Sequence, residues 1–415
     1  MKILFDISVL GRGFFKNTAR TGVFRTIDNL VKIIVNSSEC EVDLYAYESL
    51  KAYLGSYRHL LTHDASNLDS FNISVNKSIF KLSNNIVKYY DRNILSDILI
   101  TIYLELFNKF FSSKKLPEKF DIFHSTYFPL PQISSTGHAK RFITIYDIIP
   151  LIYPEYFQLK SNHLIKKVVD SIDRENDFVL CISESTKNDL CNYIEIDPSR
   201  VSVTHLAAAK DIFYKATDVA YLEKVKRLYK LPEEQYFLSV STLEPRKNIE
   251  MVIRSFSRLV DEEKIKDLKL VLVGTKGWDY QSIFKEAERN SRIKDNIIFT
   301  GYVPDEDLAG IYSRALAFIY PSFYEGFGLP PLEAMQCGVP VITSNRSSLP
   351  EVVGDAGIMI DPNCDDELCN YMLEIYKNKS FRKKLASKAI KRAKLFSWDK
   401  CAQDTINAYK NALND

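Results

Sequence analysis

Glycines and prolines around one expected helix start create a group of free backbone donors. The segment PSFYEGFGLPPLEAMQCGVP, at 321–340, follows a strand-like run and carries Gly326 and Gly328 just before a helix that should begin near Leu329. Prolines at positions 330 and 331 fall in the first turn, where a missing N–H is tolerated. The remaining donors are the amides of Gly326, Phe327, Gly328 and Leu329. Such a helix end suits a phosphate or an array of sugar hydroxyls.

Two carboxylates bracket this helix start. Glu325 lies on the loop and Glu333 in the early helix. Carboxylates are poor phosphate ligands but good acceptors from a vicinal diol. The pair therefore indicates a ligand with both sugar hydroxyls and phosphate. The structural alternative is that both side chains only stabilise the positive end of the helix.

A second candidate is STLEPRKN at 241–248, again between a strand and a helix. Arg246 and Lys247 have the wrong charge for a helix N-terminus, so an anion should compensate them. A diphosphate would do so. A solvated basic turn is the alternative.

The elements that must position these residues alternate between short apolar runs and longer helical patterns. Six strands are expected in each half. Those of the first half are 3–6, 41–45, 121–124, 142–146, 178–182 and 201–204, and those of the second are 236–240, 268–273, 297–300, 316–320, 339–343 and 357–360. Continuous apolar strands separated by helices are typical of parallel sheets covered on both faces. The prediction is an α/β protein with two doubly wound, Rossmann-like domains facing across a cleft.

Length and composition agree with this and exclude other classes. A chain of 415 residues exceeds what one core supports. The expected parts are 1–207, 208–395 and a final helix at 396–415 that returns to the first domain. The net charge of +2 gives no sign of nucleic-acid binding. Seven cysteines without a CxxC pair and a start that does not resemble a signal peptide favour a reducing cytoplasm.

The second half resembles the retaining nucleotide-sugar glycosyltransferases of family 4, which have the two-domain GT-B architecture. The segments that carry the resemblance are STLEPRKN, LVLVGTKGW, FTGYVPDEDL, YPSFYEGFGLPPLEAMQCGVPVITSN and LPEVVGDAG. Glu325 and Glu333 match the E-x7-E signature of that family. One departure is Ser241, where many members have glycine.

The resemblance implies roles for individual residues on the donor side. Arg246 and Lys247 would hold the donor diphosphate, Glu333 the ribose, and Glu325 the transferred sugar. The implied donor-binding set also includes Thr242, Gly326, Phe327, Gly328 and Leu329, with Tyr302 and Val303 near the base.

The first half is similar to the family through TGVFR, DIFHSTYFPLP, ITIYDIIPLIYPE and CISESTKNDL. Many members have histidine followed by aspartate where this chain has Tyr146 and Asp147, so the pair is a variant of a segment tied to catalysis. Gly22, Arg25 and His124 are expected on the acceptor side. For His124, a purely structural role is the alternative.

The resemblance implies retaining, metal-independent transfer without a cofactor. Arg246, Lys247 and Glu325, with Tyr146 and Asp147, form the expected catalytic group. No enzyme nucleophile is required, because the leaving diphosphate would guide the acceptor. The acidic run 305–307 could suggest a metal site, but its position after a proline is typical of a helix start.

Aromatic and basic residues between 87 and 115 could rest on a membrane surface where a lipid-linked acceptor is presented. A pair of core helices is the alternative. A protein at the inner face of the cytoplasmic membrane would fit the first interpretation.

Three functional hypotheses follow. The first is transfer of a hexose, with GDP-mannose favoured as donor, to a saccharide acceptor in bacterial O-antigen, capsule or exopolysaccharide synthesis. The second is other nucleotide-sugar chemistry on the same scaffold, as in a phosphorylase, hydrolase or epimerase. The third is a weakened binding module, which only Tyr146 supports.

Overall fold

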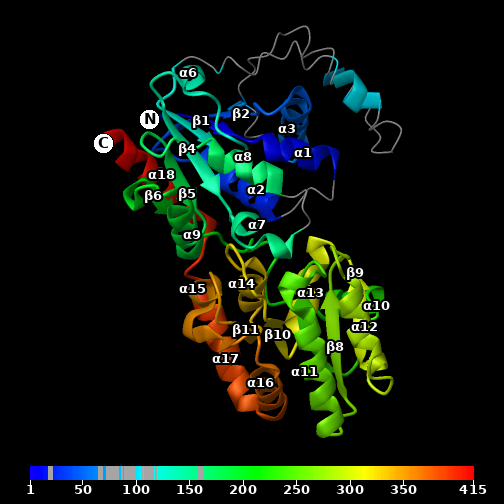
Figure 1. Cartoon of the computed structure of the whole chain (residues 1–415). Helices are drawn as coiled ribbons and strands as arrows, with labels where there is room; N and C mark the ends of the chain where they lie inside the picture. Colours follow the sequence, from blue (N-terminus) through cyan, green and yellow to red (C-terminus); the bar gives the residue numbers. More distant parts are fainter. Residues whose placement is uncertain are drawn as a thin grey trace.

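The computed structural model describes residues 1–16, 22–63, 69–71, 84–85, 87, 99–104, 106, 116, 119–157 and 162–415. The expected membrane-facing segment at 87–115 lies for the most part outside these residues. Two parallel sheets, one in each half of the chain, organise the described part (Figure 1).

The first sheet has the strand order β2-β1-β3-β4-β5-β6, and every described pairing in it is parallel. Its strands are β1 (Lys2–Asp6), β2 (Glu41–Tyr45), β3 (Ile122–Ser125), β4 (Lys140–Ile145), β5 (Phe178–Cys181) and β6 (Val201–Val203). The strand sequence reverses between β1 and β3, which is the switch point of this sheet.

The second sheet has the order β12-β11-β10-β7-β8-β9 and is also parallel. Its strands are β7 (Gln235–Val240), β8 (Leu268–Val273), β9 (Ile297–Gly301), β10 (Ala317–Tyr320), β11 (Val341–Ser344) and β12 (Ile358–Ile360). Here the switch point lies between β7 and β10, and open sheets of this kind bind ligands at the carboxyl ends of such strands.

Helices connect the strands and cover both sheets (Figure 1). In the first half they are α1 (Ser8–Phe15), α2 (Gly22–Ile34), α3 (Leu50–His63), α6 (Ile133–Thr136), α7 (Ile149–Ile152), α8 (Asn162–Asp170) and α9 (Glu184–Ile194). In the second half they are α10 (Val219–Leu228), α11 (Ile249–Glu262), α12 (Gln281–Glu288), α13 (Asp305–Arg314), α14 (Leu329–Gln336), α15 (Leu349–Val353), α16 (Asp365–Lys377), α17 (Lys379–Ala393) and α18 (Trp398–Asn414).

The sequence pattern predicted this architecture correctly. All twelve expected strands are present, with ends that differ by at most two residues. The central strands β3, β5 and β10 are buried along their whole length, as parallel strands covered on both faces must be. Their continuous apolar runs therefore reflect two covering layers of helices.

The C-terminal helix α18 lies against the first sheet, although it follows the second sheet in sequence (Figure 1). The hydroxyl of Tyr409 on α18 is 2.5 Å from Nδ1 of His124 on β3. Lys410 forms an ion pair with Glu39 of the first half. The helix thus ties the end of the chain to the first sheet, and the division at 207 and 395 remains a prediction.

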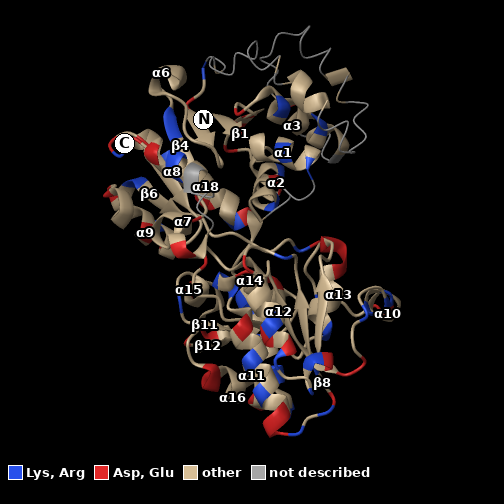
Figure 2. Ribbon diagram, turned by 45° about the vertical axis from the view of Figure 1, so that its right-hand side comes forward, with Lys and Arg blue, Asp and Glu red and all other residues tan. Residues whose placement is uncertain are grey.

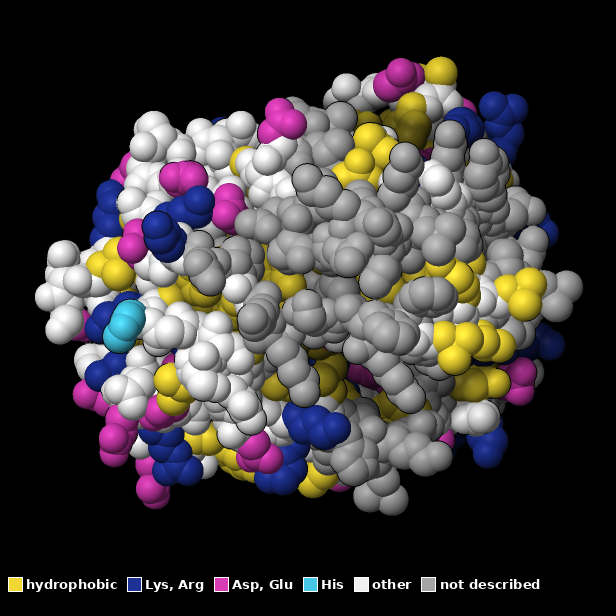
Figure 3. All heavy atoms as spheres, turned by 90° about the horizontal axis from the view of Figure 1, so that it is seen from above, with side chains coloured by type: hydrophobic (Ala, Val, Ile, Leu, Met, Phe, Trp, Pro, Cys, Tyr) yellow, Lys and Arg dark blue, Asp and Glu magenta, His cyan; other side chains and the backbone are white. Residues whose placement is uncertain are grey.

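Charge shows no large one-sided feature in the described residues. Basic and acidic side chains are distributed over both halves (Figure 2). None of the described helices is long and apolar enough to span a membrane. Seen from above, apolar side chains are visible on the face of the N-terminal half (Figure 3).

Candidate active site

The switch point of the second sheet brings the basic pair and the loop carboxylate together. Arg246 and Lys247 follow β7, and Glu325 follows β10. Nζ of Lys247 is 2.6 Å from Oε1 of Glu325, and Nη1 of Arg246 is 2.9 Å from Oε2. The hydroxyls of Ser322 and Tyr320 donate to Oε1 at 2.6 and 2.9 Å. The two motifs that the sequence singled out are therefore one cluster.

Glu325 and the two cations stabilise each other's charged forms although all three residues are buried. Burial alone would raise the pKa of Glu325, but Arg246 and Lys247 lower it to about 2. Burial opposes the charge of Arg246, while Glu325 and Glu244 hold its pKa above the ordinary value. Burial and the neighbouring Arg246 lower the pKa of Lys247. Nη2 of Arg246 also lies 2.8 Å from Oε1 of Glu244, so two cations and two carboxylates form the cluster. Two cations held in fixed positions at one helix start are suited to an anionic ligand.

Glu333 lies in α14, the helix that follows the glycine-rich loop. Its side chain is buried, and burial raises its pKa to about 7. Tyr312 donates a hydrogen bond to Oε2 at 3.2 Å. Nη1 of Arg25, from α2 of the first half, lies 3.5 Å from Oε1, and Nε of Arg25 lies 3.4 Å from Asp305. Arg25, expected on the acceptor side, is therefore placed beside the expected ribose ligand.

The start of α14 fits closely against the first half. Gly328, at the N-cap, has a φ of 117°, a conformation that glycine adopts without strain. A Cβ on Gly326 would lie 2.4 Å from the carbonyl oxygen of Tyr146 and 2.9 Å from Cβ of Asp147. Only glycine allows this approach. The glycine-rich loop thus sits directly opposite the variant Tyr146–Asp147 segment.

Asp147 shares the electrostatic environment of the basic cluster. Burial raises its pKa, whereas Arg246 lowers it and Glu325 raises it further. Its Oδ1 accepts a hydrogen bond from the amide of Ile149 at 3.1 Å. Burial also raises the pKa of Tyr146, so its phenol stays protonated at neutral pH. This agrees with a hydrogen-bonding role for Tyr146 and opposes a role as a base.

The structure favours a purely structural role for His124 over a role in acceptor binding. The side chain is fully buried, and burial lowers its pKa to about 3. Its two ring nitrogens lie 2.5 Å from the Tyr409 hydroxyl and 2.8 Å from the Thr144 hydroxyl. The expectation that His124 faces an acceptor is therefore corrected: the imidazole sits in the core because β3 points it toward α18.

The remaining expected residues differ in position and in exposure. Gly22 begins α2, and a Cβ there would come within 3.5 Å of the Leu329 side chain. Phe327 is buried against Phe396, so only its backbone is available to a ligand. Thr242 and Tyr302 are exposed, whereas Val303 is buried.

Ser241, the departure from glycine, directly follows β7 in the segment that leads to the basic pair. Its hydroxyl is buried and has no hydrogen-bond partner among the described residues. A buried hydroxyl without a partner is destabilising, so a phosphate or sugar oxygen at this position would satisfy it.

The acidic run at 305–307 forms the first turn of α13, as expected. Asp305 pairs with Arg25, and Asp307 accepts a hydrogen bond from Tyr229 at 2.6 Å. Within the described part of the chain, no group of three or more histidine, cysteine or acidic residues could hold a metal ion.

Sequence reasoning missed contacts that close the site from the first half. Tyr324 donates to both oxygens of Asp189 on α9, at 2.8 and 2.9 Å. Glu351 accepts from the amide of Glu184 at 2.9 Å and pairs with His205. These contacts join segments that are distant in sequence, so no local sequence signal indicated them.

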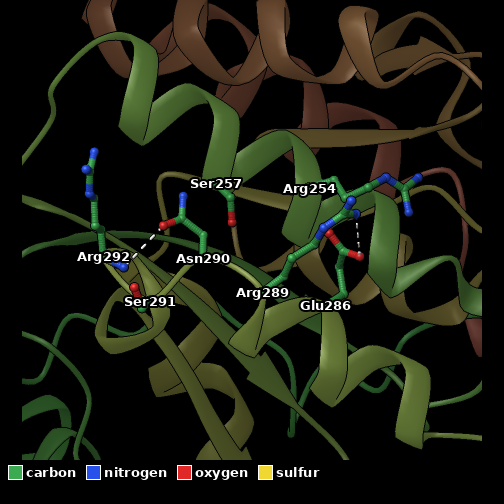
Figure 4. A pocket seen from close by; sticks show the side chains of 7 residues that line it. All are labelled: Arg254, Ser257, Glu286, Arg289, Asn290, Ser291 and Arg292. Carbon is green, nitrogen blue, oxygen red and sulfur yellow. Dashed lines mark hydrogen bonds and ion pairs between the residues drawn. The ribbon is translucent and has the colours of Figure 1, made fainter.

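A separate basic hollow of about 440 Å³ lies between α11 and α12 (Figure 4). Arg254, Arg289 and Arg292 line it, but Arg254 is bound to Asp365 at 2.7 Å and Arg289 lies 3.6 Å from Glu286. None of the residues that the sequence singled out contributes to it. It is therefore not the candidate site.

Comparison with known proteins agrees with this geometry. Residues 223–392 match the family model "Glycosyl transferases group 1". The chain is 36% identical over 353 residues to "O-antigen chain mannosyltransferase B" of Escherichia coli, across 84% of this chain and 90% of that protein. The chain belongs to the group 1 glycosyltransferases. The resemblance seen in the sequence is thus confirmed.

Solved structures show the same fold at low sequence identity. A glycosyltransferase from Rickettsia africae has a TM-score of 0.66 at 18% identity, covering 100% of this chain and 99% of that one. HepE from Anabaena, in complex with UDP and glucose, has a TM-score of 0.62 at 15% identity, with 98% of each chain covered. This group 1 glycosyltransferase therefore has the GT-B fold, and its family implies a nucleotide-sugar donor and a saccharide acceptor.

Proposed function

We propose that this glycosyltransferase transfers mannose from GDP-mannose to a saccharide acceptor of an O-antigen, with retention of anomeric configuration and without a metal. The single observation that carries the chemistry is the buried cluster of Arg246, Lys247 and Glu325 opposite Asp147. The sugar and the polymer are supported by the 36% identical relative, whose name is O-antigen chain mannosyltransferase B.

The cluster can stabilise charge that develops on a leaving diphosphate. Two buried cations beside a helix start are oriented before the reaction, and electrostatic stabilisation is strongest where water is excluded. In this proposal the two cations bind the phosphate oxygens directly, which is the role that a metal would otherwise take. Glu325, which both cations hold ionised, would accept hydrogen bonds from sugar hydroxyls.

Retention is proposed from the resemblance to a retaining family, and attack guided by the leaving phosphate requires no enzyme nucleophile. Asp147 is bound to the amide of Ile149, and the phenol of Tyr146 is protonated. The leaving phosphate would then accept the acceptor proton on the face from which it departs. Tyr146 and Asp147 orient the sugar in this scheme.

Donor identity and stereochemistry are tested together. Wild-type protein is incubated with GDP-mannose, UDP-glucose or UDP-galactose, an excess of EDTA and a panel of mannose-containing glycosides. We expect transfer from GDP-mannose alone, and an α linkage by NMR of the product. Transfer from a UDP-sugar would contradict the proposed donor, and a β linkage would contradict retention. Loss of transfer in EDTA would contradict metal independence.

We also propose that the N-terminal half rests on a membrane that presents a lipid-linked acceptor. Residues 99–104 are helical, and Leu99, Ile102 and Leu106 are 67%, 53% and 66% exposed. Their spacing places them on one helix face, as in interfacial helices. Changing all three to serine should weaken sedimentation with anionic lipid vesicles, whereas Leu228→Ser, an exposed leucine of the other half, should not. Equal sedimentation of both variants would contradict membrane contact at this face.

A further inference from the structure

A hollow of about 410 Å³ lies where loops of the two halves meet, beside the candidate active site. Aromatic rings from both halves line it, together with polar side chains at its mouth: Tyr153, Tyr156, Phe323, Tyr324, Arg346 and Asn363. Its volume falls within the range of about 300–1,000 Å³ that is typical of small-molecule sites.

The hollow lies on a defined side of the active site. Its residues from the second half follow β10, β11 and β12, whereas the base side, at Tyr302, follows β9 at the opposite edge of the sheet. Arg246 and Lys247 follow β7, between these two ends. Along the sheet edge, the order is therefore base, diphosphate, transferred sugar and then the hollow.

Hydrogen bonds join the hollow to the active site. Nη1 of Arg246 donates to the carbonyl oxygen of Tyr324 at 2.5 Å, and the amide of Phe323 donates to the carbonyl oxygen of Arg246 at 2.9 Å. The amide of Glu325 donates to the hydroxyl of Ser347, which lines the hollow, at 2.9 Å. A group bound in the hollow therefore lies next to the residue expected to hold the transferred sugar. A position beyond that sugar is where an acceptor hydroxyl must approach.

The lining has the chemistry of a pyranose site. The ring centroids of Tyr153 and Tyr324 are 4.8 Å apart, and those of Tyr156 and Phe323 are 6.0 Å apart with planes inclined by 4°. Tyr324 is also fixed by its bond to Asp189. Flat, fixed rings suit the C–H face of a sugar ring, while a few polar groups at the rim fix its orientation.

The polar rim supplies these groups. Arg346 donates to Asp361 at 3.2 Å and is about half exposed, so further N–H donors of its guanidinium remain accessible. Asn363 is exposed at the same mouth. Both can bind hydroxyls, and Arg346 is the single cation among the lining residues, which is too little positive charge for a diphosphate.

We propose that this hollow binds a hexopyranosyl unit of the acceptor, with its ring against the aromatic wall formed by both halves. The inference rests on the proposed transferase function and assigns part of acceptor recognition to the second half, through Phe323, Tyr324 and Arg346. An acceptor bound there would contact both halves at once.

Saturation-transfer NMR with methyl α-mannopyranoside as the probe tests this site. We expect signals from its ring protons with the wild type, and an affinity about tenfold lower with Phe323→Ala or Tyr156→Ala, which corresponds to the loss of one aromatic contact. Tyr193→Ala, which removes a partly exposed tyrosine of α9 outside the hollow, should bind the probe as the wild type does. If truncation of a ring unfolds the protein, Phe323→Tyr and Arg346→Ala replace the alanine variants in the same experiment. Phe323→Tyr should retain probe binding, and Arg346→Ala should weaken it.

Titration of the same samples with GDP-mannose separates the two hypotheses. Unchanged probe binding in the hollow variants, or no probe binding to a wild type that binds GDP-mannose, would overturn the acceptor site and leave the donor assignment intact. A wild type that binds the probe but no nucleotide-sugar would instead overturn the proposed transferase function.

Discussion

Arg25 and Glu333 lie 3.5 Å apart although they belong to different halves of the chain. Glu333 is buried on the second half, and Arg25 reaches it from α2 of the first. The residue expected to bind the ribose is thus in contact with the opposite half. Any ligand of Glu333 must therefore interact with the guanidinium of Arg25 or displace it.

The first prediction concerns this pair. Arg25→Ala should lower the affinity for GDP-mannose about tenfold near pH 7. The substitution removes the positive charge that favours the ionised form of Glu333. A tenfold change corresponds to about one hydrogen bond to a charged group. Titration calorimetry measures the change. Arg254→Ala, which breaks the pair with Asp365 far from the site, is the matched control. Equal affinities of wild type and Arg25→Ala would show that the contact does not affect donor binding.

A pH dependence of donor binding follows from the raised pKa of Glu333, which is about 7. Ribose hydroxyls donate to a carboxylate, so binding favours the ionised form and releases a proton below that pKa. Affinity for GDP-mannose should therefore fall as the pH is lowered from 8 to 6. The substituted diphosphate of the sugar nucleotide does not titrate in this range. Calorimetry in buffers of different ionisation enthalpy should detect the released proton, and Glu333→Gln should bind weakly at every pH. A proton release that persists in Glu333→Gln would assign it to another group.

The basic pair should act mainly in the transition state. Arg246→Ala or Lys247→Ala should lower kcat about 100-fold or more, because charge on the leaving phosphate grows as the glycosidic bond breaks. Initial rates over a range of donor concentrations measure the effect, and circular dichroism checks the fold. An increase in KM with kcat unchanged would indicate uniform binding of substrate and transition state.

Glu325 should be required for stability as well as for binding. Glu325→Gln leaves Arg246 and Lys247 buried without their shared carboxylate, and removing one partner of a buried pair costs about 3–5 kcal/mol. GDP should then raise the melting temperature of this variant by more than that of the wild type, because a diphosphate restores the missing negative charge. Thermal-shift assays with GDP and guanosine compare the two effects. If guanosine stabilises the variant as much as GDP does, the phosphates do not contact the cluster.

The extent to which the sequence predicted this site depended on how local each signal was. The twelve strands and the α14 loop could be predicted because apolar periodicity and the glycine and proline positions act within a few residues. That both motifs lie after strands could also be predicted, since ligands of such sheets bind at the carboxyl ends of the strands, but the direct contact between Lys247 and Glu325 was not predicted. The position of His124 in the core could not be predicted, because its partner Tyr409 comes from a helix near the other end of the chain. The aromatic hollow was missed for the same reason: Tyr156 and Phe323 meet only when the halves pack.

The last prediction addresses the variant pair opposite Gly326. The phenol of Tyr146 stays protonated, so it can donate a hydrogen bond but cannot accept the acceptor proton at neutral pH. Tyr146→Phe should lower turnover about tenfold, the worth of one neutral hydrogen bond. Asp147→Ala should cost more, because it removes the carboxylate proposed to orient the sugar and leaves the amide of Ile149 without its partner. Single-turnover rates with saturating donor separate these effects from binding. Complete loss of transfer in Tyr146→Phe with intact donor affinity would contradict the positioning role, and unchanged rates in both variants would show that this wall of the first half takes no part in catalysis.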